Sequence, residues 1–142
     1  MARRSAAVVS EVMRRVRYRH TSPEVILRKA LWARGLRYRL HDTRLPGKPD
    51  IVFPARRVAV FVDGDFWHGN QWRLRKLPSL AHQFRETPTA PYWVSKISRN
   101  IERDADADRK LAKMGWMVVR CWESQVKKDL QQCIERVERA IK

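Results

Sequence analysis

The stretch LPGKPDIVFPARRVAVFVDGDFWHG, residues 45–69, contains two short apolar runs, IVF and VAVFV, joined by PARR. Apolar, valine-rich runs on either side of a turn-like segment predict a β-hairpin. Titratable side chains lie at the ends of the two predicted strands. Asp50 opens the first strand, Asp63 ends the second, and Asp65 and His68 follow closely. Core packing does not require these charges, so they need a second explanation.

Elements predicted before the hairpin are a helix and a short strand. Residues 21–35 predict the helix, because Thr21 and Glu24 match a capping box and Gly35 can end it. Residues 36–41, LRYRLH, alternate in the manner of a strand.

The second half of the chain predicts two helices and a strand. Residues 70–91 are irregular and interrupted by prolines, and a long helix runs from about residue 92 to residue 114, closed by Gly115. Residues 116–122, WMVVRCW, predict a buried strand, and residues 127–142 predict an amphipathic helix. This order of elements predicts an α/β fold around a central sheet.

The composition indicates one globular domain, residues 1–142, with a polyanionic partner. A hydrophobic content of 44% with six tryptophans favours a folded core. Lys and Arg number 31 against 15 Asp and Glu, and the net charge of +16 is typical of proteins that bind nucleic acid. Residues 1–20 are strongly basic and predict an N-terminal arm or short helix.

Membrane association and disulfide bonding are not expected. The sequence has no apolar run long enough for a transmembrane helix and no visible signal peptide. Cys121 and Cys133 are too few for a disulfide framework and form no metal-binding pair motif. We therefore expect a cytoplasmic protein associated with the nucleoid.

Asp50 and Asp63 predict either a metal site or turn chemistry. Antiparallel pairing would bring these two strand ends together, and adjacent carboxylates repel each other unless a cation lies between them. Oxygen ligands of this kind suit Mg²⁺. Alternatively, Asp50 follows Pro49 as part of a turn, and Asp63 and Gly64 form an Asp-Gly turn.

The long helix favours the metal-site hypothesis. Asp104 lies on the same helix face as the apolar residues Ile97 and Ile101. An aspartate directed at the core needs a partner, and His68 is a suitable one. A carboxylate fixes the tautomer of an imidazole and raises its basicity, as a general base requires. A purely structural Asp–His hydrogen bond, or an ion pair between Asp104 and an arginine, is the alternative.

Four strings in order, LPGKPDIVF, VAVFVDGDFWHG, YWVSKISRNIERD and GWMVVRCWE, resemble the very-short-patch repair endonucleases. These belong to the PD-(D/E)XK, or restriction-endonuclease-like, nucleases. The resemblance covers about residues 14–123 and implies an α/β/α sandwich with a central mixed β-sheet. It implies a Mg²⁺-dependent hydrolase that nicks one DNA strand at T·G mismatches, which arise when 5-methylcytosine deaminates.

The resemblance also implies roles for individual residues. Asp50 would bridge two Mg²⁺ ions, and the backbone carbonyl of Val62 would help to coordinate one of them. His68 would activate water, oriented by Asp104. Glu24 would support the water molecules around the metal.

Three aromatic residues are implied to enter the DNA base stack beside the mismatch: Phe66, Trp67 and Trp93. Core packing is the alternative for all three, especially for Trp93, which begins the apolar stripe of its helix. Separating a base step costs free energy, and a mismatch lowers that cost.

The sequence departs from this family at a zinc site that many members build from cysteines and histidines. The matching positions here are Asp65, Asn70, Trp72 and Ser124. These residues are not a zinc ligand set, so we expect no structural zinc. Packing around Trp72 and Phe84 is expected to hold residues 70–91 instead.

Two aspartates mark further departures. Asp63 stands where some relatives have histidine, and would be a second metal ligand or a base that holds water. Asp65 stands where the broader PD-(D/E)XK motif has lysine. The altered loop of residues 70–91 suggests an alternative function, a restriction, defence or structure-specific DNA nuclease without mismatch preference, and a third is a non-catalytic DNA-binding module. We expect a monomer, functionally linked to a cytosine methyltransferase.

Overall fold

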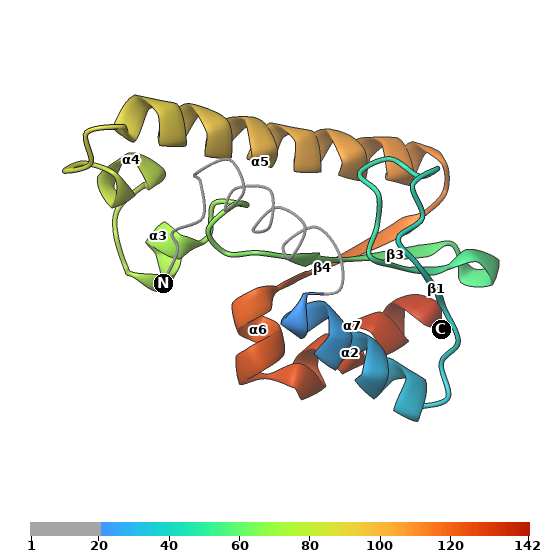
Figure 1. Cartoon of the computed structure of the whole chain (residues 1–142). Helices are drawn as coiled ribbons and strands as arrows, with labels where there is room; N and C mark the ends of the chain where they lie inside the picture. The colour runs from blue at the N-terminus through green and yellow to red at the C-terminus, as the bar shows by residue number, and fades with distance from the viewer. Residues whose placement is uncertain (1–20) are drawn as a thin grey trace, which may run out of the picture.

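The computed structural model describes residues 21–142, and the basic segment predicted as an arm or helix lies outside these described residues. A four-stranded sheet forms the middle layer, and the long helix α5 (Ala90–Lys113) lies along one of its faces (Figure 1). The opposite face is covered by α2 (Ser22–Ala33), α6 (Glu123–Lys128) and α7 (Leu130–Ile141). The predicted α/β/α sandwich is confirmed.

The central sheet is mixed, as predicted. Its strands are β1 (Arg39–Leu40), β2 (Ile51–Phe53), β3 (Val58–Asp63) and β4 (Met117–Trp122), in the order β1-β2-β3-β4. Strand β2 is antiparallel to both β1 and β3, whereas β3 and β4 are parallel. The predicted hairpin is therefore β2–β3, and a 3₁₀ turn at Pro54–Arg56 connects its strands. Helix α5 makes the long crossover that a parallel pair requires.

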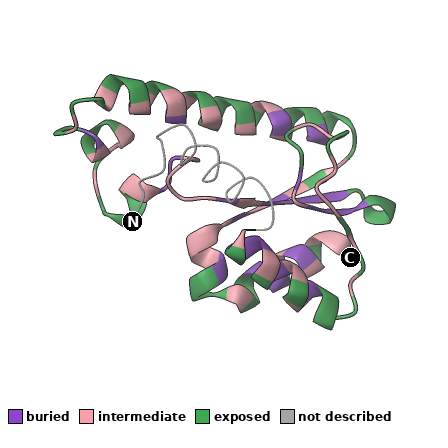
Figure 2. Cartoon of the chain, in the orientation of Figure 1, coloured by how far each residue is buried: buried purple, intermediate pink, exposed green. Residues whose placement is uncertain are grey.

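Side chains of the hairpin alternate between two cores, one on each face of the sheet. Ile51 and Val60 pack with Leu27 of α2 in the larger core. Val52 and Phe61 pack with Leu111 of α5 in the smaller core. Figure 2 shows buried residues in the strands and on the helix faces that meet the sheet. This two-sided burial explains why both strands read as nearly continuous apolar runs.

The predicted capping box at the start of α2 is wrong. Thr21 is the N-cap residue, but its side chain makes no capping hydrogen bond. Glu24 is 1% exposed and points inward, where its carboxylate contacts Arg28 and His41. The Arg28 guanidinium and the His41 imidazole together outweigh the single backbone amide that a capping box would offer to Glu24.

Other element boundaries also differ from the prediction. The strand predicted over residues 36–41 shortens to β1, and the irregular stretch of residues 70–91 contains two short helices, α3 (Gln71–Leu74) and α4 (Leu80–Gln83). The predicted C-terminal helix divides into α6 and α7 at Asp129, which is extended and caps α7 by accepting a hydrogen bond from the Gln132 amide. Within residues 21–142, no helix combines the length and the apolar character needed to cross a membrane.

Leu111→Ala is expected to lower the free energy of unfolding by about 2–5 kcal/mol, because the Leu111 side chain is fully buried between α5 and the sheet. Thermal unfolding measured by circular dichroism would record this loss as a lower Tm. The control is Met114→Ala, at the end of the same helix, where the side chain is 47% exposed and little change is expected. An equal decrease in Tm in the two variants would contradict the packing of Leu111 in the smaller core.

Candidate active site

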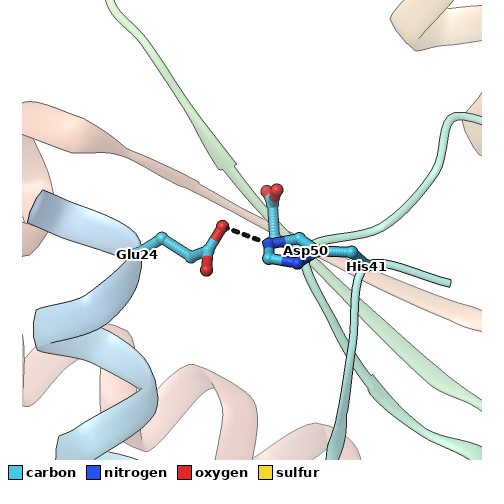
Figure 3. Close-up of side chains that lie close together, drawn as sticks. All are labelled: Glu24, His41 and Asp50. Carbon is cyan, nitrogen blue, oxygen red and sulfur yellow. Dashed lines mark hydrogen bonds and ion pairs between the residues drawn. The ribbon is translucent and has the colours of Figure 1, made fainter. Parts of the chain in front are cut away.

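Three polar side chains meet beside the start of β2, and we call them the Asp50 cluster: Glu24, His41 and Asp50. One ligand atom from each lies within 4.8 Å of the others. Nε2 of His41 lies 2.7 Å from Oε1 of Glu24, and the Asp50 carboxylate stands next to this pair (Figure 3). The residues come from the first turn of α2, the end of β1 and the start of β2.

Strand pairing places Asp50 and His41 together. The His41 amide donates to the Asp50 carbonyl (3.0 Å), which continues the β1–β2 ladder beyond β1. The Asp50 amide donates to the Val60 carbonyl (3.0 Å), and the Val62 amide donates to Oδ2 of Asp50 (2.7 Å). Main-chain hydrogen bonds thus fix both the position and the side-chain direction of Asp50.

Burial raises the pKa of Asp50 to about 7, although the hydrogen bond from the Val62 amide lowers it. Nearby charges on Glu24 and Asp63 raise this pKa further. The ionised carboxylate therefore lacks sufficient positive compensation in its surroundings, and a bound cation would supply it. The Asp50 carboxylate is the kind of oxygen ligand that a divalent ion such as Mg²⁺ prefers, while Arg28 and His41 contact the two oxygens of Glu24.

A second group, which we call the His68 cluster, consists of Asp63, His68 and Asp104. Nδ1 of His68 lies 2.5 Å from Oδ2 of Asp104 and 3.8 Å from Oδ1 of Asp63. A carboxylate only accepts hydrogen bonds, so the His68 proton lies on Nδ1 and Nε2 is left as an acceptor. The structure thus brings together the His68 and Asp104 side chains that the sequence pattern paired.

Opposing influences act on the pKa of His68. Burial lowers it, but the hydrogen bond to Asp104 and the negative charges of Asp63 and Asp104 raise it, and the net result is a raised pKa. The His68 charge in turn lowers the pKa of Asp50, so the two clusters interact electrostatically. An imidazole made more basic beside a buried carboxylate is typical of a hydrolytic centre.

Helix α5 holds the loop that carries His68. Nδ2 of Asn100 donates to the Trp67 carbonyl (3.0 Å). Gly69 has a φ of +77°, and a Cβ there would lie only 2.6 Å from Cδ1 of Ile101. Gly69 therefore meets both a backbone requirement and a steric one, which allows His68 to approach the helix that carries Asp104.

Asp63 belongs to the His68 cluster rather than to the Asp50 cluster. Ile51 pairs with Val60 in the hairpin register, so Asp63 extends past the start of β2. Both of its carboxylate oxygens accept hydrogen bonds from Nη1 of Arg120, at 3.1 and 3.0 Å. Burial raises the pKa of Asp63, while the charges of His68 and Arg120 lower it. A metal ion at Asp63 would have to compete with this guanidinium.

Asp65 links three segments through its carboxylate. It accepts hydrogen bonds from Nδ2 of Asn70 (2.9 Å), the Ser124 amide (3.0 Å) and the Ser124 hydroxyl (2.7 Å). Three of the four positions at which the sequence resemblance implied a lost zinc site, Asp65, Asn70 and Ser124, are thus joined by hydrogen bonds. The fourth, Trp72, lies under the guanidinium of its neighbour Arg73, 5.0 Å from the ring centre.

The three residues predicted to enter DNA lie together in an aromatic cluster with Phe84. Ring centres are 5.1 Å apart for Phe66 and Trp67, 5.4 Å for Phe66 and Trp93, and 5.7 Å for Trp67 and Trp93. Phe84 is buried and stacks on Trp93 at 6.1 Å. Phe66, Trp67 and Trp93 are themselves only half-buried, so the cluster combines a packed base with accessible ring surface.

Sequence reasoning missed two residues of the site. His41 ends a weak strand pattern, and only the β1–β2 pairing brings it beside Asp50. Arg120 gave a clearer signal, since it is the charged residue within the apolar string WMVVRCW. Charge inside a buried strand indicates an internal ion pair.

Asp50→Asn is expected to stabilise the metal-free protein near pH 8. The pKa of Asp50 is 3.8 in its ordinary state and about 7 in the folded protein, so the folded state holds the proton more tightly. The folded protein therefore loses stability as the pH rises from 3.8 to about 7. Asparagine does not ionise, so the variant does not lose this stability. We expect a Tm several degrees higher near pH 8 in EDTA, with the gain disappearing toward pH 4.

Asp106→Asn is the control for this measurement. Asp106 is an acid of α5 whose pKa is lowered, chiefly by its hydrogen bond with Lys110, so its loss should give no gain in Tm. A wild-type protein as stable as Asp50→Asn near pH 8 would contradict the account of a poorly compensated Asp50 carboxylate.

Comparison with known proteins identifies the family. Residues 3–74 match the family model described as DNA mismatch endonuclease Vsr. The chain is 43% identical to the type II nicking enzyme V.NmeDIP of Neisseria meningitidis serogroup C, over 86% of this chain and 78% of that protein. It is 36% identical to the DNA mismatch endonuclease Vsr of Escherichia coli K12, over 82% and 70% of the respective chains. Together with the fold, these similarities show that the chain belongs to the Vsr family of DNA endonucleases.

Proposed function

We propose that this protein is a Mg²⁺-dependent endonuclease that nicks one strand of duplex DNA at T·G mismatches. The observation that carries the proposal is the 2.5 Å contact between His68 and Asp104, with His68 close enough to Asp50 for its charge to lower the pKa of that carboxyl. The names of the relatives add support, since one is called a DNA mismatch endonuclease and another a nicking enzyme. The net charge of +16 suits a DNA ligand.

His68 acts as the general base in this proposal. Its Nδ1–H donates to Asp104, which leaves Nε2 to take a proton from the water that attacks the scissile phosphate. Asp104 keeps the ring in this tautomer and stabilises the positive charge that the ring gains. The two residues come from different elements, the loop after β3 and helix α5, so the fold must hold both for the pair to form.

Asp50 and the backbone carbonyl of Val62 would hold Mg²⁺. The family resemblance implies that two Mg²⁺ ions bind. When bound, Mg²⁺ would offset the charge that builds on the phosphate and on the departing oxygen. Glu24 lies at the edge of this site, where His41 and Arg28 hold its two carboxylate oxygens at 2.7 Å each. Glu24 is thus positioned to orient water rather than to bind the metal directly.

In this proposal Asp63 forms an ion pair with Arg120 and does not bind a metal ion. Both of its oxygens accept hydrogen bonds from the guanidinium, which leaves Asp50 as the strand-end carboxylate suited to a cation. The aromatic cluster would enter the base stack, and a mismatched step is the one that separates at lowest cost. One active site makes one cut, so a monomer suffices for nicking.

A strand-specific cleavage assay tests the proposed function. The substrate is an end-labelled duplex with one T·G mismatch, compared with its matched T·A twin, in Mg²⁺ or in EDTA. We expect nicking of the T strand of the mismatched duplex, dependent on Mg²⁺. Asp50→Asn and His68→Ala should each lower kcat by roughly 100-fold or more, because each removes a chemical group from the reaction. Asp106→Asn, an exposed acid of α5, should retain activity.

Other outcomes of this assay would reject the proposal. Equal cleavage of the two duplexes would indicate a nuclease without mismatch preference. Tight DNA binding without cleavage, across several methylated sequence contexts, would indicate a binding module. Nicking that persists in EDTA would rule out the role given to Asp50.

Trp67→Ala tests the proposed insertion of the aromatic cluster. We expect kcat/KM on the mismatched duplex to fall by about 5- to 150-fold, the equivalent of 1–3 kcal/mol for one stacked base. A fluorescent 2-aminopurine beside the mismatch should brighten when the wild-type protein unstacks it, and should brighten less with the variant. Trp32→Ala is the control, because Trp32 is 49% exposed near the end of α2 remote from Glu24. Equal brightening with Trp67→Ala and the wild type would argue for core packing alone.

A further inference from the structure

Arg120 occupies an unusual place for a charged residue. It lies in the middle of β4, opposite Phe61 of β3, and its guanidinium stands 4.0 Å from the centre of the Phe61 ring. The alternation of the sheet directs it toward α5, and its side chain is 20% exposed. A charge in this position requires partners that offset the cost of its burial.

Three aspartates from two elements surround this guanidinium. Asp63 ends β3 and accepts two hydrogen bonds from Nη1, at 3.1 and 3.0 Å. Asp108 of α5 accepts from Nε at 2.9 Å and lies 2.8 Å from Nη2. Asp104, one helical turn before Asp108, has its carbonyl 3.4 Å from Nη2 and its Oδ1 3.7 Å from Nη1. Arg120 thus connects the end of β3, which leads to His68, with the turn of α5 that carries Asp104.

We infer that Arg120 is a positioning residue that holds Asp104 opposite His68. The inference rests on the proposed function, in which the His68–Asp104 pair supplies the general base. The direct contacts of Arg120 with Asp104 are long, whereas those with Asp63 and Asp108 are short. Arg120 therefore acts mainly by joining β3 to α5 at the distance that the His68–Asp104 hydrogen bond needs.

The planar shape of the guanidinium explains why arginine is required. Nη1 is directed to Asp63, while Nε and Nη2 are directed to Asp108, so one side chain serves two carboxylates with fixed geometry. Lysine carries the same charge on a single ammonium group and cannot hold two carboxylates in a fixed orientation. With its donors directed inward at aspartates, Arg120 is not arranged as a ligand for DNA phosphate.

The first test is spectroscopic and does not depend on nuclease activity. Imidazole ¹⁵N spectra of histidine-labelled protein distinguish a ring protonated on Nδ1 from one protonated on Nε2, and His68→Gln would assign the signals. We expect His68 to be the Nδ1–H form in the wild type and a mixture in Arg120→Met. Arg34→Met should leave the spectrum unchanged, because Arg34 pairs with Glu138 and Gln131 away from the site.

The second test separates kcat from KM on the mismatched duplex. Arg120→Met should lower kcat by roughly 10- to 100-fold, as expected for a misplaced catalytic pair, with KM and DNA affinity changed less than about threefold. Arg120→Lys should fall between Arg120→Met and the wild type. Full activity in Arg120→Lys would overturn the requirement for the arginine geometry, and unchanged kcat in Arg120→Met would overturn the inference itself.

If Arg120→Met does not fold, both tests are carried out with Asp108→Asn instead. That change removes the negative charge and one acceptor oxygen from the Asp108 contact, at a side chain that is 39% exposed, while the hydrogen bonds of Arg120 with Asp63 remain. We expect the same kind of spectral change and a smaller loss of kcat, and wild-type values for both would overturn the inference. A wild-type protein that nicks no duplex would reject the proposed function, while the ¹⁵N spectra would still decide whether Arg120 holds the His68–Asp104 pair.

Discussion

Electrostatic compensation of buried carboxylates at one end of the sheet is the constraint on which the site depends. Five acidic side chains converge there from α2, β2, β3 and α5: Glu24, Asp50, Asp63, Asp104 and Asp108. Their mutual repulsion would open the sandwich if they remained unpaired. Arg28 and His41 face Glu24, Arg120 faces Asp63 and Asp108, and His68 faces Asp104. Asp50 accepts a hydrogen bond from the Val62 amide instead. Each basic partner comes from the sandwich itself, so the fold and the site stabilise each other.

The placement of Arg28 and Arg120 gives Asp50 and Asp63 different surroundings. Asp63 has a guanidinium on both oxygens, whereas Asp50 has a backbone amide on one, and burial raises its pKa to about 7. In the proposed function Asp50, which lacks such a guanidinium, is the aspartate that would bind a metal ion, at a cost to the stability of the metal-free protein. Such a cost is expected where a side chain serves function more than folding.

Local sequence patterns predicted much of the fold but only part of the site. Two-sided burial of β2 and β3 made their apolar runs easy to recognise, and the spacing on α5 placed Asp104 correctly near His68. The sequence could not provide the hairpin register, and the expected pairing of Asp50 with Asp63 depended on it. His41 escaped notice because a two-residue strand gives almost no periodic signal. The capping box at Glu24 was wrong because its carboxylate turns inward to Arg28 and His41, which the sequence spacing alone could not reveal.

The loop after β3 must hold aromatic rings and a histidine in one orientation, although few of its backbone groups belong to regular structure. Separate contacts fix it at each end. Asp65 ties its start to α6 through Ser124, and Asn100 of α5 binds the carbonyl just before His68. Because α5 also carries Asp104, any shift of this helix would move Asp104 and the loop that carries His68 together. The aromatic cluster would move with them, so under the proposed function insertion into the base stack and cleavage of the strand would depend on the same helix.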